Sequence, residues 1–323
     1  MKVLVTGGAG YIGSHTVKNL LAKGHDVVVF DNFSSGRKEL LTGGQVVKAD
    51  LKDPAALDGV FQNHKLEAVL HFASLIQVGE SFLDPGKYYA QNLTGSLNLL
   101  EAMRRAGVKV FIFSSSAAVY GVPRETPITE EHPLAPANPY GQTKYFVETI
   151  LQDYSRAYGL KYISLRYFNA SGADPEGRLG EMHDPETHLV PNILLSLLGK
   201  KGEVEVFGTD FGTPDGTAIR DYIHVSDLAE AHALALDRLA AGAPSDVINL
   251  GTNRGYSVLE VIKKVEEVTS RPVHYRASAR RKGDVPVLLA SKEKAERLLG
   301  WKLRSSDLET IIATAWRWHS KLT

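Results

Sequence analysis

The feature that most constrains the fold is a short apolar run followed by spaced glycines and a helical pattern. The run KVLVT is rich in β-branched residues and predicts a buried strand. Gly7, Gly10 and Gly13 follow at G-x-x-G-x-x-G spacing and lead into YIGSHTVKNLLAKG, which has helical periodicity. Glycine permits a tight turn and a close approach to a pyrophosphate, which the free N–H groups of a helix start can bind. Strand, glycine turn and helix in this order predict a dinucleotide-binding unit.

Two acidic residues indicate which dinucleotide is bound. Asp31 closes the apolar run VVVF, about twenty residues beyond the glycine turn, where a carboxylate binds the ribose hydroxyls of the adenosine. A carboxylate there would repel a 2′-phosphate, so NAD is favoured over NADP. The next strand, in VVKADL, ends at Asp50 and Leu51, and in such folds this position faces the adenine.

Further strands and helices alternate along the first half. AVLHFAS (68–74) and the start of VKVFIFSSSAAVYG (108–121) predict strands, and a long helix is predicted between them. This alternation predicts a Rossmann-type, doubly wound parallel α/β sheet, whose ligands bind beyond the carboxyl ends of the strands. Phe72, Ala73 and the serines 114 to 116 fall at such ends. The polar groups therefore converge on one edge of the sheet.

NPYGQTK, at 138–144, predicts a helix start with Asn138 as the N-cap and Pro139 at the first helical position. The helix runs to Gly159, a plausible left-handed terminator. Tyr140 and Lys144 are four residues apart and therefore share one face. A tyrosine and a lysine at this spacing are usually surface residues, so the motif alone does not define a site.

Composition narrows the classes of function. The 323 residues contain no cysteine, which excludes disulfides, cysteine nucleophiles and thiolate metal ligands. Lys plus Arg and Asp plus Glu each number 37, which gives no sign of nucleic acid or membrane binding. No apolar stretch approaches a membrane span, and we expect a cytoplasmic protein. The histidines show no H-x-x-x-H or H-x-x-E-H spacing, so no metal is expected, and His71 is expected to be a hydrogen-bonded core residue.

Three motifs in this order make the chain resemble a known superfamily. TGGAGYIG, FSSSAAVYG and YGQTK resemble the extended short-chain dehydrogenase/reductases, and more closely their UDP-hexose 4-epimerases. The resemblance continues through LRYFNASGA, GTAIRDYIHVSDLAEAH, NLGTNRGYSVLEV and RRKGDVP, so it covers essentially the whole chain. It implies interconversion of UDP-glucose and UDP-galactose. Sugar C4 is oxidised transiently by bound NAD, the 4-keto sugar turns over, and hydride returns to its opposite face.

The resemblance also implies the catalytic residues. Tyr140 takes the proton of the sugar 4-hydroxyl, and the Lys144 ammonium and the positive nicotinamide ring favour its phenolate. Ser116 hydrogen-bonds the same hydroxyl, and Lys144 also holds the nicotinamide ribose. The positions expected around NAD are Gly7, Gly10, Tyr11, Ile12, Gly13, Asp31, Asn32, Ser35, Gly36, Asp50, Leu51, Phe72, Ala73, Ser74, Asn92, Ser114, Tyr140, Lys144 and Phe168.

A UDP-sugar site is implied mainly in the second half. Arg220 and Arg281 match arginines at the diphosphate, for which a planar guanidinium is well suited, and Asp284 matches the acid at the uridine ribose. Leu288 matches a gatekeeper beside the sugar 2-substituent, and its intermediate size suggests some tolerance of UDP-GlcNAc. The full set expected around the substrate is Ser116, Tyr140, Asn169, His188, Leu189, Phe207, Arg220, Tyr222, Arg281, Asp284 and Leu288.

Several alternatives stay open. Sugar-nucleotide dehydratases usually carry an Asp-Glu pair where this chain has Ala117 and Ala118, which argues against elimination of water. An epimerase of N-acetylhexosamines, hexuronates or pentoses, or a non-catalytic NAD-binding regulator, would have the same fold. We expect an NAD-binding domain at 1–170 and a smaller α/β substrate domain at 171–323, with the chain crossing between them. The resemblance also implies a homodimer through helices 87–106 and 139–158. Leu97, Met103, Ile150 and Tyr154 would lie on the outer faces of these helices, although the same residues could equally face the sheet.

Overall fold

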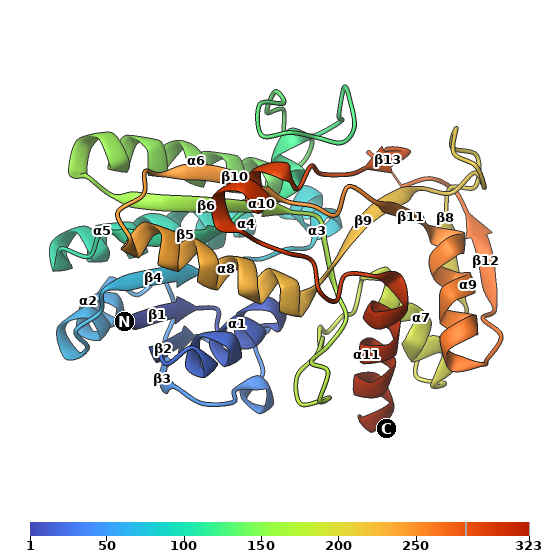
Figure 1. Ribbon diagram of the computed structural model, residues 1–323, viewed down its shortest axis with the longest axis horizontal. Coiled ribbons are helices and arrows are strands. Elements are labelled where there is room, and N and C mark those ends of the chain that lie inside the picture. The colour runs from blue at the N-terminus through green and yellow to red at the C-terminus, as the bar shows by residue number, and fades with distance from the viewer. Residues whose placement is uncertain (282, 323) are drawn as a thin grey trace.

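The computed structural model describes residues 1–281 and 283–322. A seven-stranded parallel sheet forms one side of the molecule, and a smaller unit of short strands and helices forms the other (Figure 1). The large sheet has the order β10-β6-β5-β4-β1-β2-β3. Its strands are β1 (Lys2–Thr6), β2 (Asp26–Asp31), β3 (Gln45–Lys48), β4 (Ala68–His71), β5 (Val110–Ser114), β6 (Lys161–Tyr167) and β10 (Asp246–Leu250). The predicted doubly wound fold is confirmed.

The strand order reverses between β1 and β4, which are parallel neighbours with Val5 opposite Leu70. In open α/β sheets a ligand binds in the crevice outside the carboxyl ends of the strands at this reversal. The glycine turn follows β1, and Phe72 and Ala73 follow β4, so both predicted segments border the crevice. β10 joins the sheet next to β6, and the chain therefore returns from the smaller unit to the large sheet.

Side chains alternate between the two faces of each strand, and an apolar core forms on each face of the large sheet. Val3 and Val5 pack on one face with helices α1 and α8, whereas Leu4 packs on the other with α2, α5 and α6. A period of two is what a strand buried on both faces requires, and it explains the uninterrupted apolar runs of the sequence. The first face carries α1 (Tyr11–Ala22), α8 (Val225–Ala240) and α10 (Glu293–Leu299). The second face carries α2 (Pro54–Asn63), α5 (Gly95–Ala106) and α6 (Pro139–Tyr158).

Helix α6 follows its sequence signals closely. The Asn138 side chain accepts a hydrogen bond from the Gly141 amide at 2.8 Å, and Pro139 occupies the first turn. Gly159 ends the helix with φ 71°, the left-handed conformation that favours glycine. The predicted limits of this helix are confirmed.

The predicted helix 87–106 is instead composite. Two short helices, α3 (Val78–Leu83) and α4 (Pro85–Tyr88), precede a π-helical segment at Tyr89–Thr94, which continues into α5. Met103 is fully buried in the core beneath α5, so its predicted place on an outer face is wrong. Its position within a helical period points it toward the sheet instead. π-helical turns occur often at functional sites, and Asn92 lies in this one.

The smaller unit is built around strand β9 (Ile219–His224). β9 pairs with β7 (Asn169–Ser171), β11 (Gly255–Ser257) and β13 (Val287–Leu288), and β8 (Val204–Phe207) pairs with β12 (Tyr275–Ser278). Helices α7 (Leu189–Leu197), α9 (Val258–Thr269) and α11 (Leu308–Lys321) share a third core with these strands. Short 3-10 turns lie at Lys38–Leu40 and Ala117–Tyr120. Across the described residues, no helix combines the length and the apolar character that crossing a membrane requires.

Candidate active site

Ser116, Tyr140 and Lys144 meet where β5 ends and α6 begins. Ser116 follows β5 and its side chain hydrogen-bonds the Tyr140 hydroxyl. The Lys144 ammonium donates to the Ser114 carbonyl at 2.8 Å and lies 5.8 Å from the Tyr140 ring centroid. Helical spacing therefore places the tyrosine and the lysine on one face, and the end of β5 brings the serine to them. Such a group can exchange a proton with a hydroxyl bound beside Tyr140.

Burial sets the protonation of these groups. It raises the pKa of Tyr140, and the hydrogen bond from Ser116 partly offsets this rise. Burial also lowers the pKa of Lys144 to about 7, although the nearby Glu148 carboxylate opposes the change. Lys144 thus holds its proton less firmly than an exposed lysine does. The expected phenolate therefore needs the positive charge of a bound cofactor in addition to this lysine.

A buried ion pair supports this corner of the sheet. Arg166 in β6 donates to Glu148 in α6 at 2.9 Å, and both side chains are almost fully buried. Glu148 also accepts from the Ser115 hydroxyl at 2.6 Å, and Arg166 donates to the Tyr120 hydroxyl at 2.9 Å. These residues tie α6 to the loop that carries Ser116. The sequence analysis missed them, although Glu148 and Arg166 each interrupt an apolar pattern.

The glycine loop lies against the end of β4. Gly7 has φ 70°, and a Cβ there would come within 2.5 Å of the Ala73 nitrogen. A Cβ on Gly13 would lie 2.2 Å from the Gly7 carbonyl oxygen. Gly10 caps α1 without a side-chain hydrogen bond. The backbone is therefore packed too closely for other residues at two of these positions, and the helix start is left open for an anion.

The acidic residues after β2 and β3 form a linked group. Asp31 accepts from the Ala9 amide at 3.0 Å and from the Phe33 amide at 2.8 Å, and burial raises its pKa. Asn32 donates to Asp50 at 2.8 Å. Gly36 is buried beside Asp31, with space for no Cβ, whereas Ser35 is exposed. The carboxylate is held at the strand end that ribose binding requires. The donor set thus fits NAD.

Other predicted cofactor positions lie around the end of β4. Phe72 and Ala73 both donate their amides to the Thr6 carbonyl. Asn92 accepts from the Leu75 amide at 2.8 Å and donates to its carbonyl at 3.0 Å, which fixes the loop after Ser74. Ala73, Ser74, Asn92 and Lys144, among others, line one narrow gap at this point.

Three predicted cofactor positions contact other parts of the chain. Ile12 packs against the core beside α1, and Leu51 is buried in the core below α5. The Tyr11 hydroxyl donates to the Gly172 carbonyl at 2.6 Å, across to the second half of the chain. The two ring nitrogens of His71 form hydrogen bonds with the Thr6 hydroxyl at 2.6 Å and with the Ser96 hydroxyl at 2.8 Å. The prediction that His71 is a hydrogen-bonded core residue is confirmed.

The charged residues of the second half are brought together. Arg281 donates to Asp284 at 3.0 Å, and Arg220 lies 3.8 Å from the same carboxylate. Arg220 is mostly buried, which lowers its pKa, and it also donates to the Val285 carbonyl at 2.9 Å. The Arg281 guanidinium lies 5.1 Å from the Phe207 ring centroid. Two guanidinium groups, a carboxylate and an aromatic ring thus form one cluster.

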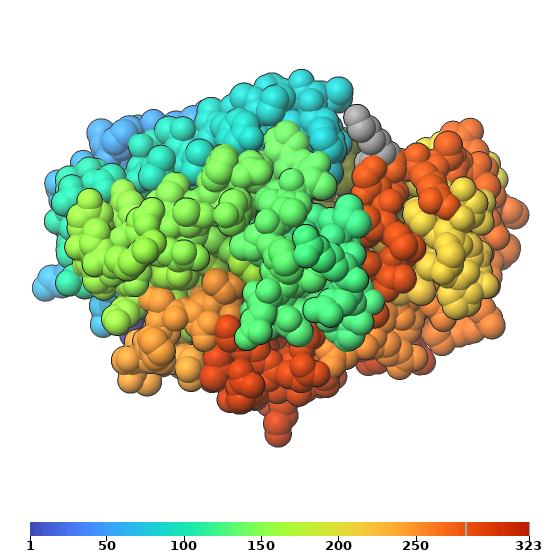
Figure 2. Space-filling model, turned by 90° about the horizontal axis from the view of Figure 1, so that it is seen from above, coloured from blue at the N-terminus to red at the C-terminus, as the bar shows by residue number. Residues whose placement is uncertain are grey.

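The remaining substrate positions divide into two groups. Asn169 and Tyr222 face each other across β7 and β9, and Asn169 donates to the Asp221 carbonyl at 2.9 Å. Phe168 and Leu288 pack on the cluster that contains Ala117, so the gatekeeper position lies beside the catalytic loop. His188 is the N-cap residue of α7, and Leu189 is the first residue of that helix. Seen from above, the loop 121–138 (green) lies between α6 and a segment of the last third of the chain (orange) (Figure 2).

Fold and site together define a dinucleotide-binding enzyme of the Rossmann class with a serine, tyrosine and lysine at its centre. The model of the NAD dependent epimerase/dehydratase family matches residues 3–251. The chain belongs to this family, as predicted, and NAD is the family's cofactor.

Similar sequences and similar solved structures show which enzymes of this family the chain resembles. A UDP-glucose 4-epimerase of Rhizobium leguminosarum bv. trifolii is 50% identical over 319 residues, which are 99% of this chain and 97% of the relative. A structure of UDP-glucose 4-epimerase from Brucella ovis in complex with NAD has a TM-score of 0.95 and 48% identity, covering 98% of this chain and 97% of that one. The enzyme from Bifidobacterium longum, in complex with NAD+ and UDP, has a TM-score of 0.95 and 42% identity, covering 99% and 98%. The predicted resemblance to UDP-hexose 4-epimerases is confirmed.

Proposed function

We propose that this chain interconverts UDP-glucose and UDP-galactose by epimerisation at sugar C4. The observation that carries the proposal is the meeting of Ser116, Tyr140 and Lys144 beside the NAD crevice, with Leu288 of the second half packed on the same loop cluster. A sugar bound between these catalytic residues and Leu288 would have C4 beside both Tyr140 and the NAD crevice. Among the described residues, no other place brings cofactor and acid–base residues together. The chain aligns with UDP-glucose 4-epimerases over nearly its whole length and nearly theirs, which supports the assignment.

Each residue has a defined part in the reaction. Bound NAD supplies the oxidant that takes hydride from C4 and later returns it. Tyr140 accepts the proton of the 4-hydroxyl and gives it back after the 4-keto sugar has turned. Ser116 orients that hydroxyl, and Lys144 lowers the energy of the Tyr140 phenolate and holds the nicotinamide ribose. Ala117 and Ala118 offer no carboxylate for elimination, which favours epimerisation over dehydration.

The cluster of Arg220, Arg281 and Asp284 is proposed to hold the UDP moiety. The guanidinium groups bind the diphosphate, and Asp284 binds the uridine ribose, so the sugar turns while its nucleotide stays fixed. Phe207 and Leu189 are proposed to border the uracil, with His188 beside them. Asn169 is proposed to reach the phosphates. The remaining residues named for NAD are proposed to bind it as predicted.

Leu288 is proposed to lie beside the sugar 2-substituent, and we therefore also propose some turnover of UDP-GlcNAc. Leucine is smaller than the tyrosine that restricts the pocket in relatives of narrow specificity, and Leu288 packs on the same apolar cluster as Phe168. The measurement is epimerisation of UDP-GlcNAc at high enzyme concentration. An enzyme active on UDP-glucose that gives no detectable product from UDP-GlcNAc would disprove this extension.

We also propose a homodimer in the cytoplasm that serves galactose metabolism. Half-buried Leu97 on α5 and exposed Phe146 on α6 are available for pairing with a second copy. Ile150 and Tyr154, which were also predicted on the outer faces, pack against the core beneath α6. A cytoplasmic site follows from the proposed substrates, because NAD and nucleotide sugars are metabolites of that compartment. A monomeric mass in sedimentation at micromolar concentration would contradict the dimer.

The decisive experiment gives UDP-galactose to purified protein without added NAD and separates the products by anion exchange. UDP-glucose is the expected product, because a cofactor that is regenerated in every cycle can remain bound. Tyr140→Phe should lower the rate by about 10²–10⁴-fold, the range of acid–base catalysis, with little change in NAD content. No product even after NAD is added would reject the proposal in favour of a uronate, pentose or regulatory function.

A further inference from the structure

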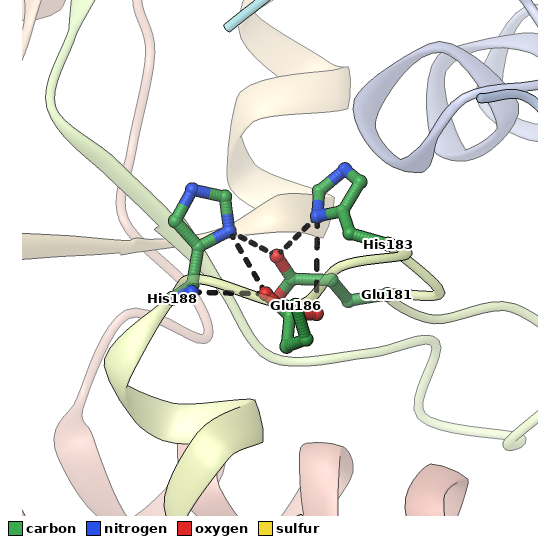
Figure 3. Close-up of side chains that lie close together, drawn as sticks. All are labelled: Glu181, His183, Glu186 and His188. Atoms are coloured by element: carbon green, nitrogen blue, oxygen red, sulfur yellow. Dashed lines mark hydrogen bonds and ion pairs between the residues drawn. The ribbon is translucent and has the colours of Figure 1, made fainter. Parts of the chain in front are cut away.

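Four potential ligand side chains converge in the segment that leads into α7. Glu181, His183, Glu186 and His188 each offer a ligand atom, and these four atoms lie within 4.8 Å of one another. Figure 3 shows the Nδ1 atoms of both imidazoles turned toward the carboxylate oxygens. All four come from eight consecutive residues, so a single loop brings them together. The spacing E-x-H-x-x-E-x-H is absent from the histidine patterns that the sequence analysis tested.

The contacts inside the cluster are mutual. His183 Nδ1 lies 3.0 Å from a Glu181 oxygen and 3.9 Å from a Glu186 oxygen. His188 Nδ1 contacts the same Glu181 oxygen and lies 3.7 Å from Glu186. Within residues 1–281 and 283–322, every ion pair of these two carboxylates is with one of these two histidines. Two buried carboxylates therefore have no lysine or arginine to balance them.

Burial makes this balance important. Glu181 is 3% exposed and Glu186 7%, and an isolated buried carboxylate is costly. Two protonated imidazoles can balance the two carboxylates, and a divalent cation can balance them instead by displacing those two protons. His188 keeps about two-fifths of its side chain exposed, which leaves an entry path.

We propose that Glu181, His183, Glu186 and His188 bind one divalent transition-metal ion, and that this ion is zinc. Two imidazole nitrogens and two carboxylate oxygens are ligands that zinc accepts in a tetrahedral site. Zinc bonds of 2.0–2.2 Å would put tetrahedral donors about 3.3–3.6 Å apart. The four donor atoms now lie within 4.8 Å of one another, so the wider pairs would close and the short contacts with Glu181 would open. Magnesium and calcium prefer oxygen ligands alone and fit this set less well.

The site has a structural role. Four protein ligands close the coordination shell, as in structural zinc sites, and none of them is Ser116, Tyr140 or Lys144. The surrounding contacts hold the loop in place. The Trp318 indole donates to the Glu181 carbonyl at 3.1 Å, and the Lys201 ammonium donates to the Glu186 carbonyl at 2.8 Å. The metal would fix the chain immediately before Leu189, where the proposed uracil pocket begins.

The test measures zinc itself. The full-length protein with its cofactor is treated with EDTA, desalted, and titrated with Zn²⁺ against a chromogenic competitor. One tightly bound zinc per chain is expected, with an increase in the unfolding temperature. Glu181→Gln and His183→Asn should each weaken binding at least 10–100-fold, because changes even outside a ligand shell cost that much. His274→Asn removes an exposed histidine of the same half and should leave the stoichiometry and affinity unchanged.

Cobalt provides a second readout that needs no variant. Co²⁺ bound to the wild-type protein should show the intense visible bands of tetrahedral coordination, and Zn²⁺ should displace it. Substoichiometric zinc binding, wild-type affinity in both ligand variants, or a weak octahedral Co²⁺ spectrum would each overturn the proposal. A variant that fails to fold leaves the cobalt result to decide. Epimerase activity is not the readout, so the zinc site and the proposed function stand or fall separately.

Discussion

The charged groups of the two halves are held in different ways. Near Tyr140, Glu148 lies on α6 and Arg166 on β6, so two regular elements hold a complete and buried ion pair. In the second half, Arg281 and Asp284 lie on a loop beside the short strand β13, and they partner each other. The first pair can only support the structure. In the proposed function the second pair exchanges its internal partners for the UDP moiety of the substrate.

The largest effect should come from breaking the buried pair. Arg166→Met leaves Glu148 charged and unpaired in the core, and we expect a loss of 3–5 kcal/mol in the free energy of unfolding, as for other broken buried pairs. The measurement is urea unfolding followed by circular dichroism. Arg276→Met, which breaks the exposed pair with Glu205 in β8, is the matched control and should cost less than about 1 kcal/mol. Equal losses in the two variants would remove the distinction between the halves.

A smaller effect is expected at the exchangeable cluster. Arg220→Met should weaken UDP binding by roughly 10–100-fold, because a hydrogen bond to a charged group contributes about 1.5–3 kcal/mol. The turnover number at saturating substrate should change much less, since Arg220 does not touch the reacting carbon in the proposed function. Calorimetry with UDP and steady-state kinetics check the two parts. Unchanged UDP affinity in this variant would mean that the arginines are structural.

One histidine from each half, His71 and His183, should give opposite dependences of stability on pH. Burial lowers the pKa of His71 from 6.5 to about 3. As the pH falls, the unfolded chain therefore takes up this proton before the folded chain does. The contribution of His71 is therefore present above pH 6.5 and is lost as the pH falls toward 3, at up to about 1.4 kcal/mol per pH unit. The neighbouring carboxylates raise the pKa of His183 to about 10 despite its burial. Its contribution is present below pH 6.5 and is lost as the pH rises toward 10.

Urea unfolding of EDTA-treated protein across pH 5–9 tests this contrast. His71→Gln should flatten the stability profile on the acid side only, and His183→Asn on the alkaline side only. The same slope in wild type and His71→Gln below pH 6 would show that His71 is not the titrating group.

The sequence predicted the first half better than the second for a physical reason. Helix α6 carries its own cap, proline and terminal glycine, and the strands alternate between two cores, so local signals and the fold agree. The π-helical segment around Asn92 has no such local signal, because it depends on contacts with Leu75 and Thr143. The roles of Arg220 and Asp284 came from family resemblance. Their pairing across 64 residues, and the meeting of Glu181 with His188, depend on loops that periodicity does not describe.

The smallest effect separates two glycines that look alike in sequence. Gly13 lies in α1 and Gly59 in α2, and helix propensity alone predicts that alanine stabilises either by roughly 0.5–1 kcal/mol. A Cβ on Gly59 would meet nothing within 4 Å, so Gly59→Ala should show this gain in thermal unfolding. A Cβ on Gly13 would lie 2.2 Å from the Gly7 carbonyl oxygen, so Gly13→Ala should destabilise the protein and weaken NAD binding. A gain in both variants would mean that the glycine turn can relax. The close packing that we assign to cofactor binding would then not be what requires glycine at this position.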